Sequence, residues 1–468
     1  MSHSANQTNA YNWRNQLSFN RGFDDDRHQV SVVAGTEMSN KVYQTTSYPK
    51  VYGYDDEKLT VGGFPNGVGG SGVYKLTNMF GSSITNPYTS SFSYSTDRYF
   101  SMYINASYTF DKKYTISGSA RTDASNLITD DPAYRFSPFW SVGASWNAKR
   151  EVFLADVDWL DELKVRGTFG YNGNVDKTTS FRPLINMSTA QNSYFQNYTA
   201  SVSSYGNPTL RWEKTGTVDL GVDFSMFKGK LYGKLDFYNR HGKDLIVSMS
   251  IPAVNGTTSQ KLNAAEMVNG GVEIELGTTL SIYGRDIVWS GNMNFSYNNN
   301  KITKLFKSSV QAYDLYMDTG TTYAYYQGYN ANTLWSLQYK GLKNTGSETS
   351  PKMRPVVLGP EGAYCDFLSW VTGGDPTTYL VNQGTVVAPF TLGFNGNFKI
   401  YDFDLSYSFT GKFGHVFRGF GFNYPYSYDT MPNKALSEIM ASDGSNLATP
   451  PPFDAGEDRY YFWDRFYP

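Results

Sequence analysis

Between Thr217 and Tyr238, apolar and polar side chains alternate along two runs that a short polar segment, residues 228–230, separates. The apolar set comprises Val218, Leu220, Val222, Phe224, Met226, Leu231, Gly233, Leu235 and Phe237. Because successive residues of a β-strand point to opposite faces, the pattern predicts a β-hairpin with one apolar and one polar face. Each run is as long as the roughly 9–11 residues that a tilted strand needs to cross a bilayer. If the hairpin repeats, a transmembrane β-barrel is predicted.

The composition is compatible with such a barrel. Aromatic residues make up 17% of the chain, with 38 Tyr and 31 Phe, and there are 44 Gly. The mean hydropathy is −0.46, and no apolar run approaches the roughly 18 residues of a transmembrane helix. Alternating membrane strands joined by polar loops would give these values. A soluble all-β protein, such as a propeller or a tandem sandwich, would give them equally well.

The hairpin pattern recurs along the chain and predicts twelve strands in six pairs. The expected pairs are 12–20 with 28–37, 98–110 with 114–123, 135–146 with 162–172, the hairpin within 212–245, 271–281 with 287–298, and 389–399 with 403–412. Connections within a pair are short, although 147–161 has room for a helix over Glu151–Asp161. Connections between pairs are long. Bacterial outer-membrane barrels have short periplasmic turns and long extracellular loops, so this asymmetry favours a membrane barrel.

Long connections are therefore expected outside the cell, and the short turns in the periplasm. The long loops are predicted at 38–96, 173–210 and 299–387, with a shorter one at 248–270 and a truncated loop region at 413–468. Loops longer than about 15 residues are unusual in compact soluble domains, which strengthens the barrel interpretation.

The alternation also predicts which side chains face lipid. We expect Leu220 and Val222, with Leu235 on the next strand, to face lipid, whereas Asp219 and Asp223 line a wet lumen together with Lys234. Aromatic residues near strand ends, such as Trp146, Trp159 and Tyr171, fit an interfacial girdle, with packing between loops as the alternative.

Five sequence blocks occur in a fixed order in the middle of the chain. They are RTDAS at 121–125, FWSVGASW at 139–146, WLDELKVRGTFGYNGN at 159–174, NPTLRWEKT at 207–215 and NGGVEIEL at 269–276. Together they resemble the SusC/RagA group of TonB-dependent outer-membrane transporters, with Ala124 and Gly270 departing from that group's pattern. Within these blocks, glycines 167, 170 and 173 predict close strand approach, and Trp212 beside Glu213 predicts an aromatic ring at the membrane edge.

The resemblance implies a barrel of about 22 strands in the outer membrane of a Gram-negative bacterium, threaded by an N-terminal plug. It also implies import of oligosaccharides or oligopeptides, a SusD-like surface lipoprotein as a lid, and coupling to the TonB complex through an N-terminal region. No segment of the sequence resembles the plug or the TonB-binding segment, and residues 461–468 do not form a closing strand. We therefore expect an all-β, antiparallel, partial barrel of about 12 strands, surrounded by outer-membrane lipid, that does not close by itself.

The 299–387 loop is the expected binding region. Its candidate substrate-binding residues are Tyr323, Tyr325, Tyr326, Trp335, Tyr339 and Trp370. Aromatic rings stack on sugars or on peptide side chains, and loops often carry binding. The alternative is that these rings pack the loop itself or contact a lid protein.

Catalytic, metal and nucleic-acid sites are not expected. The net charge is −2, Cys365 is the single cysteine, and the four His are dispersed at positions 3, 28, 241 and 415. No Gly-x-Ser-x-Gly elbow lies between a strand and a helix, no cofactor motif is present, and the alternating Asp219 and Asp223 fit lumen polarity better than a glycosidase pair. Two alternatives stay open: an outer-membrane binding or adhesion barrel without energised transport, and a soluble β-rich glycan-binding protein, enzyme or lectin.

Overall fold

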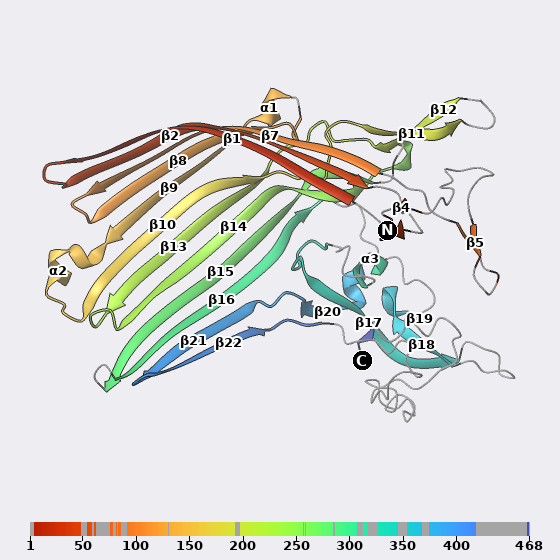
Figure 1. Ribbon diagram of the computed structural model, residues 1–468. Coiled ribbons are helices and arrows are strands. Elements are labelled where there is room, and N and C mark those ends of the chain that lie inside the picture. The colour runs from red at the N-terminus through yellow and green to blue at the C-terminus, as the bar shows by residue number, and fades with distance from the viewer. Residues whose placement is uncertain are drawn as a thin grey trace.

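A single antiparallel sheet of twelve strands dominates the computed structural model, in the order β1-β2-β7-β8-β9-β10-β13-β14-β15-β16-β21-β22 (Figure 1). The strands are β1 (Ser4–Phe23), β2 (His28–Ser47), β7 (Ser91–Phe110), β8 (Tyr114–Ser125), β9 (Ser137–Asn147), β10 (Leu160–Asn174), β13 (Glu213–Met226), β14 (Leu231–Ser250), β15 (Ser259–Tyr283), β16 (Ile287–Leu305), β21 (Phe390–Ile400) and β22 (Phe403–Phe413). The structure describes residues 4–47, 54–58, 60–61, 75–77, 81, 83–85, 91–129, 131–191, 197–255, 257, 259–283, 286–306, 312–316, 325–344, 353–366, 374–417 and 466–467.

The sheet is open. In the part of the chain that the structure describes, β1 and β22 form its two edges, and no ladder joins them. Short turns gather at one end of the strands and the long connections at the other, as Figure 1 shows. The expected all-β antiparallel architecture, with an unclosed sheet, is confirmed.

The strands are longer than the alternation predicts, because they continue beyond the apolar band. β2 extends to Ser47 and β7 starts at Ser91, and most of the loop expected at 248–270 belongs to β14 and β15. These extensions show no regular alternation of apolar and polar residues, and ladder hydrogen bonds define them as strands. The helix expected over Glu151–Asp161 is present but shorter than predicted. It is a one-turn helix, α2 (Val152–Ala155), which follows a 3₁₀ turn, η1 (Ala148–Arg150).

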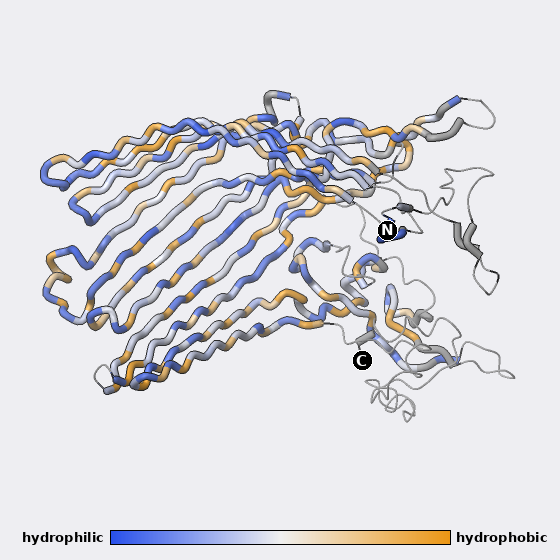
Figure 2. The backbone as a smooth tube through the Cα atoms, viewed as in Figure 1, coloured by the Kyte–Doolittle hydropathy of each residue, from blue (hydrophilic) through white to orange (hydrophobic). Residues whose placement is uncertain are grey.

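The register gives the sheet two chemically distinct faces. One hydrogen-bonded row crosses all twelve strands through Gly22, Gln29, Thr109, Thr115, Ser145, Arg166, Gly221, Asp236, Glu273, Ser296, Thr391 and Lys412. The next row consists of Phe23, His28, Phe110, Tyr114, Trp146, Val165, Val222, Leu235, Ile274, Phe295, Leu392 and Gly411. Directly opposed residues share a face, so we call these the polar face and the apolar face. Figure 2 shows the resulting alternation of hydropathy along the strands.

The apolar face is exposed rather than covered. Leu17 is 80% exposed, Ile116 64% and Leu220 57%. A soluble sheet would bury such side chains, at a gain of about 25 cal/mol per Å². Among the residues that the structure describes, no helix has the length and apolar character needed to cross a membrane.

Glycines on the strands lie beneath aromatic rings of neighbouring strands. A Cβ at Gly35 would collide with Tyr103, and one at Gly271 with Tyr238. At Gly170 a Cβ would come within 2.6 Å of the Ser141 Cβ, which confirms the expected close strand approach. The high Gly and Tyr contents are thus coupled, since each ring covers backbone that a glycine leaves open.

The connection after β16 forms a small folded unit, which we call the loop lobe (residues 312–316, 325–344, 353–366 and 374–385). Its elements are α3 (Ala312–Tyr316), β17 (Thr333–Asn344), β18 (Met353–Leu358), η3 (Pro360–Gly362), β19 (Tyr364–Asp366), η4 (Pro376–Thr378) and β20 (Leu380–Thr385). β23 (Phe466–Tyr467) pairs with β17. Trp335, Val357 and Tyr379 lie in its buried core.

The remaining elements are short pieces of the other long connections. They are β3 (Tyr54–Asp55), β4 (Thr60–Val61), β5 (Lys75–Thr77), β6 (Ser83–Thr85), α1 (Pro132–Arg135), β11 (Leu184–Gln191), β12 (Tyr198–Ser204) and η2 (Ala253–Asn255).

Candidate binding surface

An ion cluster centred on Arg166 lies on the polar face. Arg166 comes from β10, and its guanidinium is 3.5 Å from an Asp219 oxygen and 3.4 Å from an Asp223 oxygen. It also contacts Asp236 of β14. One cation thus joins three carboxylates from two strands, and all four side chains are less than one third exposed. This arrangement suits a wet but partly shielded wall, where charges need partners.

A second ion cluster lies on the same face, towards the edge strand β1. Arg14 is 3.1 Å from Glu37, whose other oxygen is 3.8 Å from Arg121. Arg121 also pairs with Asp123 at 2.8 Å and donates a hydrogen bond to Ser101. The four charged residues of this cluster border a cavity of about 660 Å³. Another cavity, of about 790 Å³, lies farther along the polar face near Lys234, Glu273 and Glu275.

The loop lobe contains four of the six aromatic residues expected to bind substrate, and two of these four are buried. Trp335 is 3% exposed and Tyr339 is 2% exposed. Tyr326 packs against Tyr329 and Trp335, with ring centroids 5.8 and 6.2 Å away. Tyr325 is 37% exposed, whereas Tyr323 and Trp370 lie outside the described residues. In this conformation Tyr326, Trp335 and Tyr339 pack the loop, which was the alternative role considered from the sequence.

A hydrogen bond joins Tyr326 to Asp375 in the loop lobe. The hydroxyl of Tyr326 donates to Asp375 at 2.8 Å, and the backbone N–H of Thr377 donates to the same carboxylate at 2.9 Å. Burial, followed by the hydrogen bond to Asp375, raises the pKa of Tyr326 to about 12. The Thr377 N–H, and then the Tyr326 hydroxyl, lower the pKa of Asp375. At neutral pH the phenol of Tyr326 is therefore protonated and can donate, and the carboxyl of Asp375 is ionised and can accept.

The lobe is joined to the sheet by backbone hydrogen bonds at the loop end of β16. The N–H of Ile302 donates to the carbonyl of Tyr329 at 2.9 Å, and the N–H of Gly328 returns a bond to Ile302 at 2.8 Å. The N–H of Ala331 donates to the side chain of Asn300. These contacts fix the base of the lobe beside the loop end of the sheet.

The NPTLRWEKT block, residues 207–215, packs at the loop end of the sheet, which we call the rim, rather than forming a membrane girdle. Asn207 is 1% exposed and binds the backbone carbonyl of Lys261, and Leu210 is fully buried. Trp212, expected at the membrane edge, is instead 6% exposed, packs edge-on against Phe139 at 5.7 Å and donates to the carbonyl of Arg135. The expectation failed because its partners come from sequence-distant segments. The block therefore stabilises the fold at this end of the sheet.

Lys177 and Asp97 form an ion pair at the same rim. Lys177 Nζ lies 2.7 Å from Asp97, which is 4% exposed, and this hydrogen bond raises the pKa of Lys177. Sequence reasoning missed this pair, because Asp97 lies on β7 and Lys177 in the connection after β10, and neither belongs to a recognisable motif. Within the described part of the chain, no group of three or more His, Cys, Asp or Glu side chains is placed to hold a metal ion.

The curated and structural relatives agree with this geometry. Residues 2–423 match the family described as TonB dependent receptor-like, beta-barrel. The chain belongs to this family. Its members are outer-membrane transport receptors rather than enzymes, so the expected location and the absence of catalysis are confirmed, and the soluble alternative is wrong.

The chain is similar to TonB-dependent receptors of the SusC/RagA type. TonB-dependent receptor SusC of Bacteroides thetaiotaomicron is 27% identical over 343 residues, 70% of this chain and 31% of that protein. A TonB-dependent receptor of Formosa agariphila is 27% identical over 316 residues, 66% of this chain and 31% of that protein. The chain thus spans about a third of the length of the curated relatives it matches.

A solved structure shows the same barrel fold. The RagAB peptide importer in its open-open state superposes with a TM-score of 0.71, over 97% of this chain and 46% of that chain, at 21% sequence identity. In a TonB-dependent receptor barrel, the twelve strands described above are part of the wall, and the loop lobe stands at one end of it.

Proposed function

We propose that this chain forms part of the wall of an energised outer-membrane importer of oligosaccharides or oligopeptides. It would work with a SusD-like surface lipoprotein and with the TonB complex, which would act through an N-terminal region outside this sequence. The observation that carries the proposal is the unbroken polar row from Gly22 to Lys412, because such a row can line a passage for a polar cargo. The similarity to SusC and to a peptide importer supports both cargo classes.

Uptake by cells that produce the full-length protein tests this proposal. Fluorescent oligosaccharides and oligopeptides should accumulate inside cells that carry the intact gene, and accumulation should stop when the proton-motive force is collapsed. Cells lacking the gene are the control. Surface binding that continues without accumulation and is insensitive to the uncoupler would instead identify a binding or adhesion barrel.

The orientation follows the asymmetry of the connections. We propose that the connections at the loop end of the sheet, which include the loop lobe, residues 175–212 and residues 251–255, lie outside the cell and that Lys228 faces the periplasm. In a Cys365→Ser background, a cysteine replacing Val254, which is 91% exposed, should react with a membrane-impermeant maleimide on whole cells. A cysteine replacing Lys228 should react only after permeabilisation. The reverse pattern would show that the orientation is inverted.

Among the candidate aromatic residues, we propose that Tyr325 contacts cargo or the lipoprotein, since its ring is accessible. Tyr323 and Trp370 remain candidates from the sequence. Tyr325→Ala should reduce the apparent affinity for uptake about tenfold, as loss of one stacking platform does, without changing the protease resistance of the lobe. Unchanged uptake would remove Tyr325 from the site.

A further inference from the structure

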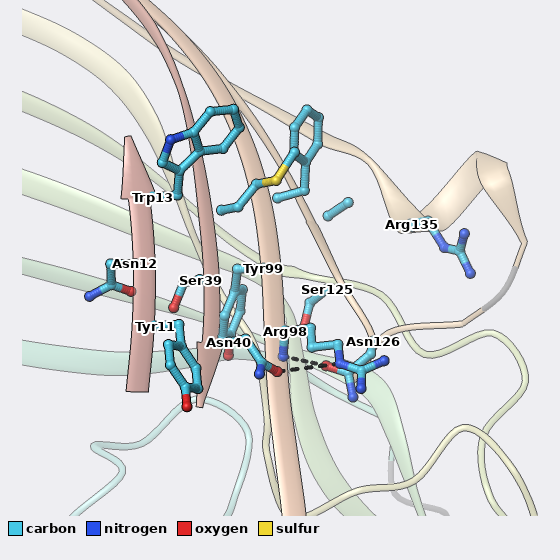
Figure 3. A pocket seen from close by; sticks show the side chains of 13 residues that line it. Tyr11, Asn12, Trp13, Ser39, Asn40, Arg98, Tyr99, Ser125, Asn126 and Arg135 are labelled. Carbon is cyan, nitrogen blue, oxygen red and sulfur yellow. Dashed lines mark hydrogen bonds between the residues drawn. The ribbon is translucent and has the colours of Figure 1, made fainter. Parts of the chain in front are cut away.

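A third cavity lies on the apolar face, at the loop end of β1, β2, β7 and β8. Its volume is about 760 Å³. Its floor is the row Trp13, Met38, Phe100 and Ala124. A second row on the same face, formed by Tyr11, Asn40 and Arg98, lies two residues nearer the loops. Asn126 lies beside this row and accepts a hydrogen bond from the backbone N–H of Arg98. Figure 3 shows how these side chains lie around the cavity.

The cavity straddles the expected upper limit of the hydrocarbon layer. On β1 the apolar side chains of this face include Phe23 at the turn end and Trp13 at the loop end. Ten residues at about 3.3 Å each, tilted by roughly 40°, span about 25 Å of bilayer thickness. This is the height of the apolar band of an outer-membrane barrel. Trp13 therefore marks the boundary, and Arg98 lies one step above it, at the level of lipid headgroups.

Arg98 is held in place but has no carboxylate partner among the residues that the structure describes. Its Nε donates to Asn40 at 3.3 Å, and its backbone N–H donates to Asn126 at 2.7 Å (Figure 3). A guanidinium has five N–H groups, so its terminal nitrogens can still donate. On the polar face, by contrast, Arg14, Arg121 and Arg166 each pair with carboxylates.

The lining of the cavity is complementary to an anion with an apolar body. It includes Arg98 and Arg135 and contains no Asp or Glu. We propose that this cavity binds the phosphorylated headgroup of a lipid in the outer leaflet. Arg98 would hold the phosphate through two N–H donors, as arginine commonly does, while Trp13, Met38 and Phe100 contact the upper acyl chains. The assignment to the outer leaflet rests on the orientation proposed above.

Native mass spectrometry of the purified full-length protein tests this site. The probes are bisphosphorylated lipid A, the same lipid after enzymatic dephosphorylation, and inorganic phosphate. We expect the phosphorylated lipid to bind about tenfold more weakly to Arg98→Gln than to the parent protein, with Arg98→Lys in between. Arg21→Gln is the matched control, since Arg21 lies on the same face, on β1 near the turn end, over the ring of Phe23.

Equal binding of the phosphorylated and dephosphorylated lipids would reduce the cavity to an apolar groove and overturn the proposal. Binding of inorganic phosphate as tight as that of the lipid would overturn it in favour of a free-anion site. An equal loss in Arg98→Gln and Arg21→Gln would also count against it. The assay measures neither uptake nor sidedness, so its failure would leave the proposed function untouched, and maleimide labelling at position 254 reports separately on the leaflet.

Discussion

Among the side chains that the structure describes on the polar face, Arg166 has the most carboxylate partners. Replacing it with Leu removes the one guanidinium that contacts Asp219, Asp223 and Asp236 together. Breaking a fully buried ion pair costs about 3–5 kcal/mol, and because Arg166 is 29% exposed we expect about 1–3 kcal/mol.

The urea midpoint of the heat-modifiable band of the full-length protein measures this loss. Arg14→Leu serves as the control, because its side chain is 58% exposed and pairs with Glu37 alone. It should change the midpoint little. Equal shifts of the urea midpoint in the two variants would show that the Arg166 cluster contributes no more to stability than the Arg14–Glu37 pair.

The Tyr326–Asp375 pair predicts an alkaline transition of the loop lobe. The pKa of Tyr326 is raised from its ordinary value of 10.0 to about 12, so the stability that its neutral form contributes is complete below pH 10. This stability is lost as the pH rises from about 10 to about 12. The pKa of Asp375 is lowered, so its contribution is present above its ordinary value of 3.8 and is lost as the pH falls below that value.

Limited proteolysis of the lobe across this range provides the measurement. The parent protein should become more sensitive between pH 10 and 12, and Tyr326→Phe should lose this transition because it has no hydroxyl to ionise. Tyr325→Phe, at the neighbouring exposed ring, should behave like the parent. A transition that persists in Tyr326→Phe would assign it to another group.

At the scale of elements, each strand presents one face to lipid and one to water. Val222 lies in the middle of the apolar series of β13, from Val218 to Met226. Arg in place of Val222 should cost about 2–4 kcal/mol near the bilayer midplane. Thr168→Arg is the control, since Thr168 is on the polar face opposite Asp219 and should be nearly neutral.

Spin labels at positions 220 and 223 of the full-length barrel test the facing directly. The label at 220 should be accessible to oxygen from the lipid phase, and the label at 223 to a water-soluble relaxation agent. The opposite accessibilities would mean that the register is reversed.

The alternation of apolar and polar residues was sufficient to predict the sheet, because successive residues of any strand point to opposite faces, whatever the rest of the fold. The pattern around Leu220 and Asp219 predicts the hairpin and the two faces that the structure shows. The strand segments around 248–270 were missed, because a ladder outside the membrane imposes no hydrophobic period on its residues. The sequence left open whether Trp335 binds substrate or packs the loop, because its burial depends on Val357 and Tyr379, whose approach only the fold of the loop determines.

At the scale of the whole molecule, two strands have unpaired edges. β1 and β22 each have a single partner in the described sheet, and open edges are not tolerated in lipid. Closing twelve strands on themselves would require a tilt and shear that match that number. We therefore expect the 468-residue chain, expressed alone, to give insoluble protein rather than a pore.

Single-channel recording and gel electrophoresis of the isolated chain test this expectation. A heat-modifiable gel shift together with a stable unit conductance would show that the chain closes and would contradict it. The full-length protein, prepared in parallel, is the control for both measurements.

The unbroken rows from β1 to β22 also limit how this gene can change in length. One residue inserted in β13 would turn Asp219 and Asp223 to the apolar face and Leu220 to the polar face. Two inserted residues would restore both faces. Descendants of this gene should therefore gain and lose codons freely in the long connections, but in even numbers within the strands.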